Sequence, residues 1–177
     1  MRAGTFPAGA DGSAPLPAAG PLRWDIIELL FFAYRDFVGD ADHVLEEFGF
    51  GRAHHRVVHF VNRMPGLTVA ELLDVLKITK QSLARVLKQL IDTGHIVQVQ
   101  GPRDRRQREL YPTEKGRALA LELAAPQSRR IGRALAAGGT DGGAGDRAAV
   151  ERFLKAMIDP ELRVQVEKLP HDTGDEA

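Results

Sequence analysis

The chain contains no cysteine, which excludes disulfide bonds, thiolate metal sites and redox sensing through a thiol. No apolar run approaches the roughly 20 residues that a transmembrane helix needs, and no signal peptide is recognisable. The sequence also lacks a glycine-rich phosphate loop and a Gly-x-Ser-x-Gly motif. We therefore expect a cytoplasmic protein that is neither membrane-bound nor an enzyme.

The chain also lacks a net charge, but its charges are unevenly distributed. Residues 67–117 contain ten Lys/Arg and six Asp/Glu, whereas the rest of the chain contains 14 and 18. A locally basic segment is the electrostatic footprint expected of a protein that binds nucleic acid. A length of 177 residues suffices for one domain of ordinary size.

The basic segment begins with a helix-turn-helix pattern. Thr68 and Glu71 match a capping box, and Thr79 is suited to cap a second helix after a short turn. The second helix has one apolar stripe, formed by Leu83, Val86, Leu87, Leu90 and Ile91. Its opposite face carries side-chain types that contact bases and phosphates, although a solvated surface would look the same. The candidate DNA-binding residues here are Thr68, Thr79, Lys80, Gln81, Ser82, Arg85 and Gln89.

Two short strands are expected next, around a basic loop. Residues 95–100 show partial alternation and include β-branched side chains, which indicates a strand. The Gly101-Pro102 pair ends it, and residues 109–111 return as a second strand. Pro112 is expected to shorten that second strand. Asp104 is interpreted as a brace that pairs with a neighbouring arginine and fixes its direction. The candidate DNA-binding residues of this wing are Arg103, Asp104, Arg105, Arg106 and Arg108.

These motifs resemble the MarR family of bacterial transcription regulators. The shared sequences are T-V-A-E-L-L, I-T-K-Q-S-L-A-R-V-L-K-Q-L, G-H-I-V, D-R-R and T-E-K-G, and the match extends from about Leu22 to Arg117. The resemblance implies a mainly α fold with a small β-wing and a winged helix-turn-helix lobe at about 52–116. It also implies homodimerisation through helices at about 22–48 and 117–169, binding of double-stranded DNA at a pseudo-palindromic operator, and a small-molecule effector. It implies no cofactor.

The flanking segments complete the expected organisation. Residues 1–20 and 171–177 are expected to be tails on a single domain at 21–170. The first helix should run past Gly39 to about Phe48, and its wide apolar surface favours burial against a partner subunit. Further helices are expected at 52–63, from about 117 to 137, and from 146 to about 158. Pro126 should kink or break the second of these helices, and Pro160 should interrupt the third.

Three histidines form the remaining candidate site. His55 and His59 have the i, i+4 spacing of some metal ligands, and His54 lies beside them. We interpret them as lining an effector pocket in the seam between the dimerisation helices and the DNA-binding lobe, with Tyr34 and Arg35 as neighbours. The alternative is a metal- or haem-sensing winged-helix module that acts mainly through a protein or ion partner. An enzyme that combines these histidines with Glu28 or Asp36 is the remaining alternative.

Overall fold

The computed structural model describes residues 22–101, 107–138, 144–167, 169 and 170. Backbone contacts divide the chain into two units, residues 1–34 and residues 35–177. The described part of the first unit is residues 22–34, which contain the beginning of helix α1 (Trp24–Gly39). Arg23, just before this helix, pairs with Asp25 at 2.9 Å. The second unit contains the rest of α1 and all the other elements.

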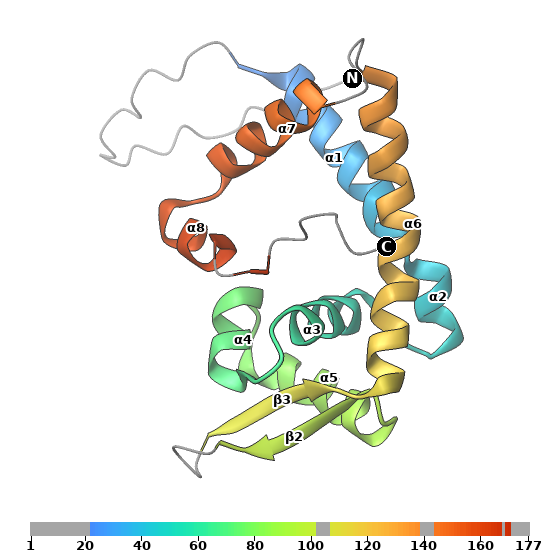
Figure 1. The fold of residues 1–177 in the computed structure, drawn as a ribbon, viewed down its shortest axis with the longest axis vertical. Helices are drawn as coiled ribbons and strands as arrows, with labels where there is room; N and C mark the ends of the chain where they lie inside the picture. The colour runs from blue at the N-terminus through green and yellow to red at the C-terminus, as the bar shows by residue number, and fades with distance from the viewer. Residues whose placement is uncertain (1–21, 102–106, 139–143, 168, 171–177) are drawn as a thin grey trace, which may run out of the picture. The chain divides into compact units, whose positions relative to one another are not determined.

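The second unit is mainly helical, with a small sheet (Figure 1). Its helices are α2 (Asp42–Glu47), α3 (Arg52–Arg63), α4 (Val69–Leu76), α5 (Lys80–Asp92), α6 (Glu114–Gly138), α7 (Ala144–Met157) and α8 (Pro160–Glu167). Its strands are β1 (Leu67–Thr68), β2 (Ile96–Gln100) and β3 (Arg108–Pro112). The expected mainly α fold with a small β-wing is therefore confirmed.

The sheet is antiparallel, in the order β1-β3-β2. Its register places Leu67 opposite Leu110 and Val97 opposite Tyr111. Strand β1 was not expected, because two residues show no periodicity and their pairing partner lies about 40 positions later. Pro112 does not shorten β3, because it occupies the last paired position, opposite Ile96.

The core of the second unit gathers apolar faces from most of its elements. The side chains that are almost completely buried include Leu45, Val57, Leu72, Leu90 and Leu123. They come from α2, α3, α4, α5 and α6, so this core holds the helix-turn-helix and the first half of α6 together. Burial of each such leucine or valine contributes about 1.5–3 kcal/mol.

The expectation of one helix from residue 22 to about Phe48 is wrong. Helix α1 ends at Gly39, and a tight turn leads to the separate helix α2. The turn buries Ala41 completely, and the Asp40 carboxylate accepts two hydrogen bonds from Arg130 of α6, at 2.5 and 2.7 Å. The long helix α6, in contrast, continues through Pro126 without a break.

Candidate nucleic-acid interface

Helix α4 begins with the expected capping box. The Glu71 amide donates to Thr68 Oγ1 at 3.3 Å, and the Thr68 amide donates to the Glu71 carboxylate at 2.8 Å. The helix ends at Leu76, and the next residue, Lys77, caps it with a left-handed backbone of φ 50° although it is not glycine. Arg56 of α3 donates to the Leu76 carbonyl at 2.6 Å, so a cation satisfies the last carbonyl of α4. Arg56 therefore fixes the turn that leads to the next helix.

Helix α5 presents the polar surface that the sequence predicts. Thr79 caps it by accepting a hydrogen bond from the Ser82 amide at 3.2 Å, and the apolar stripe is buried, with Ile91 only partly so. Four candidate side chains on its first turns are exposed: Lys80, Gln81, Ser82 and Arg85. Those of Lys80, Gln81 and Arg85 make no hydrogen bond or ion pair with any described residue, so they are available to a ligand.

Gln89 differs from the other four candidates on this helix. Its side-chain oxygen lies 2.9 Å from His54 Nε2, and its nitrogen lies 3.4 Å from the Gly49 carbonyl. The Gly51 amide donates to His54 Nδ1 at 3.1 Å, so Nδ1 is unprotonated and Nε2 carries the hydrogen that is donated to Gln89. The role of Gln89 in DNA binding stays a prediction, and it would require this hydrogen bond to break.

The wing consists of β2 and β3, which pair over five positions from Ile96 to Gln100. A hydrogen bond of 3.0 Å from the Gly101 amide to the Gln107 carbonyl closes the ladder toward the tip. Arg108, at the start of β3, is exposed. The other four wing candidates, Arg103, Asp104, Arg105 and Arg106, lie outside the described residues.

The Thr-Glu-Lys-Gly motif at residues 113–116 joins three elements. Thr113 Oγ1 accepts from the Gly116 amide at 3.0 Å and donates to the Gly94 carbonyl at 2.7 Å. Lys115 donates to the Thr93 carbonyl at 3.0 Å, so it binds the end of α5. A Cβ on Gly116 would lie 2.0 Å from the His95 carbonyl oxygen, so no side chain fits there. The motif therefore fixes the wing relative to α5 and α6.

His95 is a buried residue that the sequence analysis did not single out. It is 1% exposed, its ring packs edge-on against Phe48 and Phe50, and its Nδ1 lies 2.9 Å from Thr93 Oγ1. Its Nε2 has no hydrogen-bond partner among the residues that the structure describes. Burial lowers the pKa of His95, and Lys115 lowers it further, so the neutral ring is favoured.

The predicted effector residues are not all brought together. His54 is turned toward Gln89. Burial lowers the pKa of His55 and of His59, and His59 is the more exposed of these two residues. Arg35 pairs with Asp36 at 3.0 Å, and Tyr34 belongs to the other unit. Among the described residues, no three His, Asp or Glu side chains are grouped as a metal site would require.

Comparison with known proteins places this geometry in a family. Residues 48–107, which include α3 to β2, match the model of the MarR family. The chain is also 50% identical over 137 residues to the HTH-type transcriptional regulator PetP of Rhodobacter capsulatus, covering 77% of this chain and 80% of that protein. The chain belongs to the MarR family. It is therefore a transcription regulator, and MarR proteins bind DNA and are not enzymes.

Solved structures of MarR proteins share the fold. A mutant of MepR from Staphylococcus aureus aligns with a TM-score of 0.64 at 15% identity, over 77% of this chain and all of that one. MarR of E. coli in its apo form aligns with a TM-score of 0.58 at 20% identity, over 76% and 97%. In this MarR protein, no helix within the described ranges is long and apolar enough to cross a membrane.

Two residues of α3 hold the helix-turn-helix through contacts that the sequence did not reveal, although His54 was a candidate for another role. Arg56 binds the end of α4, 20 positions later, and His54 binds Gln89 in the second half of α5, 35 positions later. No local pattern reveals such pairs. The only signal was the concentration of basic and imidazole side chains on a helix that directly precedes the helix-turn-helix.

Proposed function

We propose that this MarR protein is a dimeric, sequence-specific DNA-binding regulator that reads its operator with α5. The observation that carries the proposal is the group of exposed, uncommitted side chains on the first turns of α5, opposite its buried stripe. In a helix-turn-helix, the N-terminal residues of the second helix meet the base edges in the major groove. Gln81, Ser82 and Arg85 are our candidates for base contacts, and Lys80 with Thr68 and Thr79 for backbone contacts.

The wing extends the proposed contact beyond the major groove. Arg103, Arg105, Arg106 and Arg108 would enter the adjacent minor groove or clamp phosphates, with Asp104 as the brace. If the dimer is symmetric, two such lobes would bind half-sites about 34–36 Å apart on a pseudo-palindromic operator. We place this activity in the bacterial cytoplasm, where such an operator would lie.

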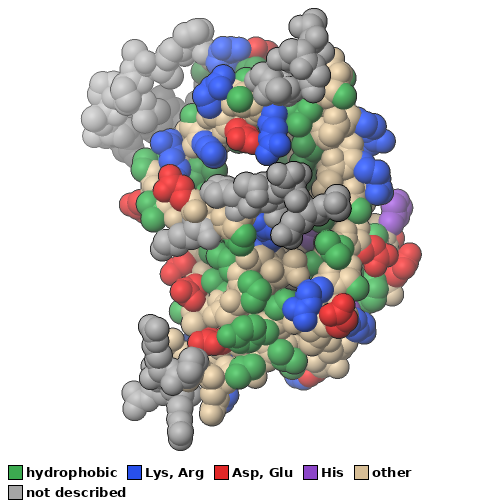
Figure 2. All heavy atoms as spheres, viewed as in Figure 1, with side chains coloured by type: hydrophobic (Ala, Val, Ile, Leu, Met, Phe, Trp, Pro, Cys, Tyr) green, Lys and Arg blue, Asp and Glu red, His purple; other side chains and the backbone are tan. Residues whose placement is uncertain are grey.

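Exposed apolar side chains support the dimer. Helix α1 has no buried residue, and its Trp24 and Phe31 are 60% and 72% exposed. Helix α7 likewise exposes Phe153 and Leu154. Figure 2 shows hydrophobic side chains among charged ones on one face of the molecule. Large exposed apolar groups on a monomer typically mark an interaction surface. Light scattering should give twice the chain mass of 19.4 kDa at micromolar concentration, and a monomer would refute this part.

Selection of bound fragments from genomic DNA tests the DNA-binding proposal. Fragments that share a pseudo-palindromic sequence are the expected result, and recovery of random fragments would contradict sequence-specific binding. Affinity for the selected duplex should fall steeply as salt increases, because phosphate contacts release counterions. A metal-sensing module that acts through a protein partner would show no duplex binding at any salt concentration.

A response to a small molecule is the final part of the proposal. His55 and His59 lie on α3, and burial lowers the pKa of both rings, so the neutral forms that suit an uncharged or weakly acidic molecule are favoured. A variant with both His55→Gln and His59→Gln should respond differently to an effector found by screening, and its effector-free affinity for DNA should change less than about threefold. His54 is left intact in this test because it positions Gln89.

A further inference from the structure

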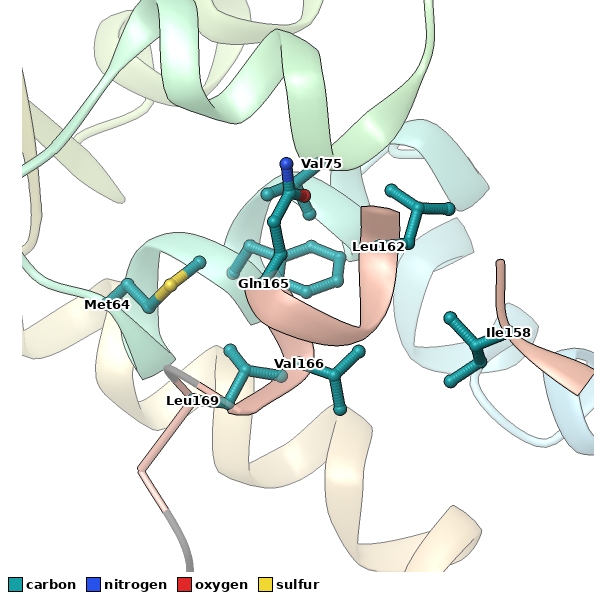
Figure 3. A pocket seen from close by; sticks show the side chains of 8 residues that line it. Met64, Val75, Ile158, Leu162, Gln165, Val166 and Leu169 are labelled. Atoms are coloured by element: carbon teal, nitrogen blue, oxygen red, sulfur yellow. The ribbon is translucent and has the colours of Figure 1, made fainter. Parts of the chain in front are cut away.

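Helix α3 contacts different parts of the fold along its length. Near its end, Phe60 and the following Met64 line an apolar groove together with Val75 of α4 and residues of α8 (Figure 3). At its start, His54 faces α5, where its Nε2 lies 2.9 Å from the side-chain oxygen of Gln89. The start of α3 is therefore joined to the proposed reading helix by a hydrogen bond between side chains.

The His54 ring is itself held in one orientation. Its Nδ1 accepts a hydrogen bond from the Gly51 amide at 3.1 Å, and the ring stacks on that of Phe50, with ring centres 4.8 Å apart and planes 8° apart. Phe50 is 7% exposed and packs edge-on against the buried His95 ring. The contact to Gln89 is therefore made by a side chain whose direction the core fixes.

The Gln89 amide is held at both of its polar atoms. Its oxygen accepts from His54, and its nitrogen donates to the Gly49 carbonyl at 3.4 Å, so both contacts lead to residues 49–54. The apolar stripe of α5 is buried, but apolar burial has no direction, so it fixes the depth of a helix better than its rotation. Hydrogen bonds require a narrow range of distances and angles, so this amide restricts the rotation of α5 about its axis.

We propose that His54 is a positioning residue for DNA reading: through Gln89 it fixes the rotation of α5, and thereby the direction in which Arg85 points. Arg85 precedes Gln89 by four residues, about one helical turn, so it shares that rotation. Side chains that recognise a ligand must be held to within about 0.5 Å and 10–20°. The inference rests on the proposed reading of the operator by α5, and it assigns Gln89 to the support of this helix instead of to a base.

Uncharged substitutions separate the contact from the other roles of these side chains. His54→Met and Gln89→Met each remove the hydrogen bond between α3 and α5 and keep a side chain of similar length. His54 is the third residue of α3, where glutamine also serves in capping boxes, so His54→Gln can accept from the Gly51 amide and still donate to Gln89. Ala53→Met is the control, because it adds the same side chain at an exposed neighbouring position.

Competition between the duplex selected from genomic DNA and its single-base variants measures the effect on reading. His54→Met and Gln89→Met should each weaken binding about three- to tenfold, the size of one lost hydrogen bond, and the double variant should lose no more than the weaker single variant. His54→Gln and Ala53→Met should bind like the unchanged protein. Additive losses in the double variant, or equal affinities of His54→Met and His54→Gln, would overturn the proposal.

The positions at which sequence preference is lost distinguish support of α5 from base contact. Gln89→Met should relax preference at the base positions that Arg85→Ala also affects, because it acts by turning the helix that carries Arg85. Relaxation at a different position would show that Gln89 reads a base itself, and would overturn the proposal.

Hydrogen exchange of the DNA-free protein tests the contact independently of DNA binding. Amides in the last turn of α5 should exchange faster in His54→Met than in His54→Gln, because the helix end opens more easily without its link to α3. Equal protection in the two variants would refute the support of α5 by His54, even if the operator is bound. Failure of the unchanged protein to prefer any duplex would instead refute the proposed function, and exchange would still decide whether His54 holds α5.

Discussion

Two glycines of α6 should respond in opposite directions to the same substitution. A Cβ on Gly116 would lie 2.0 Å from the His95 carbonyl oxygen, where non-bonded heavy atoms normally stay about 3.5 Å apart. A Cβ on Gly132 would meet nothing within 4 Å. Gly116→Ala should therefore force the backbone apart, whereas Gly132→Ala should only improve helix propensity.

The sizes of the opposing free-energy contributions decide whether each substitution stabilises or destabilises the protein. Replacing glycine by alanine within a helix stabilises a protein by up to about 1 kcal/mol. Overpacking against backbone costs about 1–3 kcal/mol, and the His95 carbonyl also accepts from the Thr113 amide at 3.1 Å, a hydrogen bond that contributes about 1 kcal/mol. Gly116→Ala should therefore destabilise by about 1–3 kcal/mol, and Gly132→Ala should stabilise by about 0.5–1 kcal/mol.

Urea denaturation at one fixed protein concentration measures both effects and avoids the concentration dependence of an oligomer. The midpoint should decrease for Gly116→Ala and increase slightly for Gly132→Ala. Stabilisation by Gly116→Ala would refute the close approach between α6 and the start of β2. It would also remove our explanation for the glycine of the Thr-Glu-Lys-Gly motif.

Three further predictions concern side chains. Arg56→Ala should reduce the free energy of unfolding by about 1 kcal/mol because the Leu76 carbonyl loses its hydrogen-bond donor. Arg56→Lys should lose less, because lysine keeps a donor. Equal denaturation midpoints for the unchanged protein and both variants would contradict this role. The fold lowers the pKa values of His55, His59 and His95. As the pH decreases, the unfolded chain therefore takes up protons before the folded chain does. The free energy of unfolding should fall as the pH decreases below about 6.5 toward those lowered pKa values. Denaturation at several pH values checks this, and His95→Phe should flatten the dependence; an unchanged slope would exclude His95 as a contributor. Asp104→Ala should weaken specific DNA binding if Asp104 braces an arginine, whereas tighter binding at every salt concentration would show that it is only an unfavourable charge.

The sequence revealed those parts of the fold that depend on neighbouring residues. The capping box of Thr68 and the cap at Thr79 are local features, and both were predicted correctly. Features that depend on distant partners were missed. The break after Gly39 is stabilised by Arg130, which lies about 90 positions away, and β1 exists only because β3 pairs with it.

The candidate site follows the same division. Helical periodicity predicted which face of α5 is exposed, because the stripe of Leu83, Val86 and Leu90 leaves only one face for Gln81 and Arg85. Periodicity could not show that Gln89, on the border of that face, is held by His54. That contact depends on how α3 crosses α5, and the crossing is set by packing of the whole core.

The most direct test of whether α5 reads the operator compares two variants, Arg85→Ala and Lys88→Ala, in their sequence preference for duplex DNA. Each substitution removes one positive charge from α5. Lys88 pairs with Asp92 at 2.5 Å toward the end of the helix, whereas Arg85 is exposed on the polar face proposed to contact DNA. Competition between the selected duplex and single-base variants of it should show that Arg85→Ala loses about 1–3 kcal/mol of binding free energy and relaxes preference at one or two positions. Lys88→Ala should weaken binding to all duplexes slightly and equally. If Arg85→Ala kept the full sequence preference, or if the two variants behaved alike, α5 would not be the element that reads DNA.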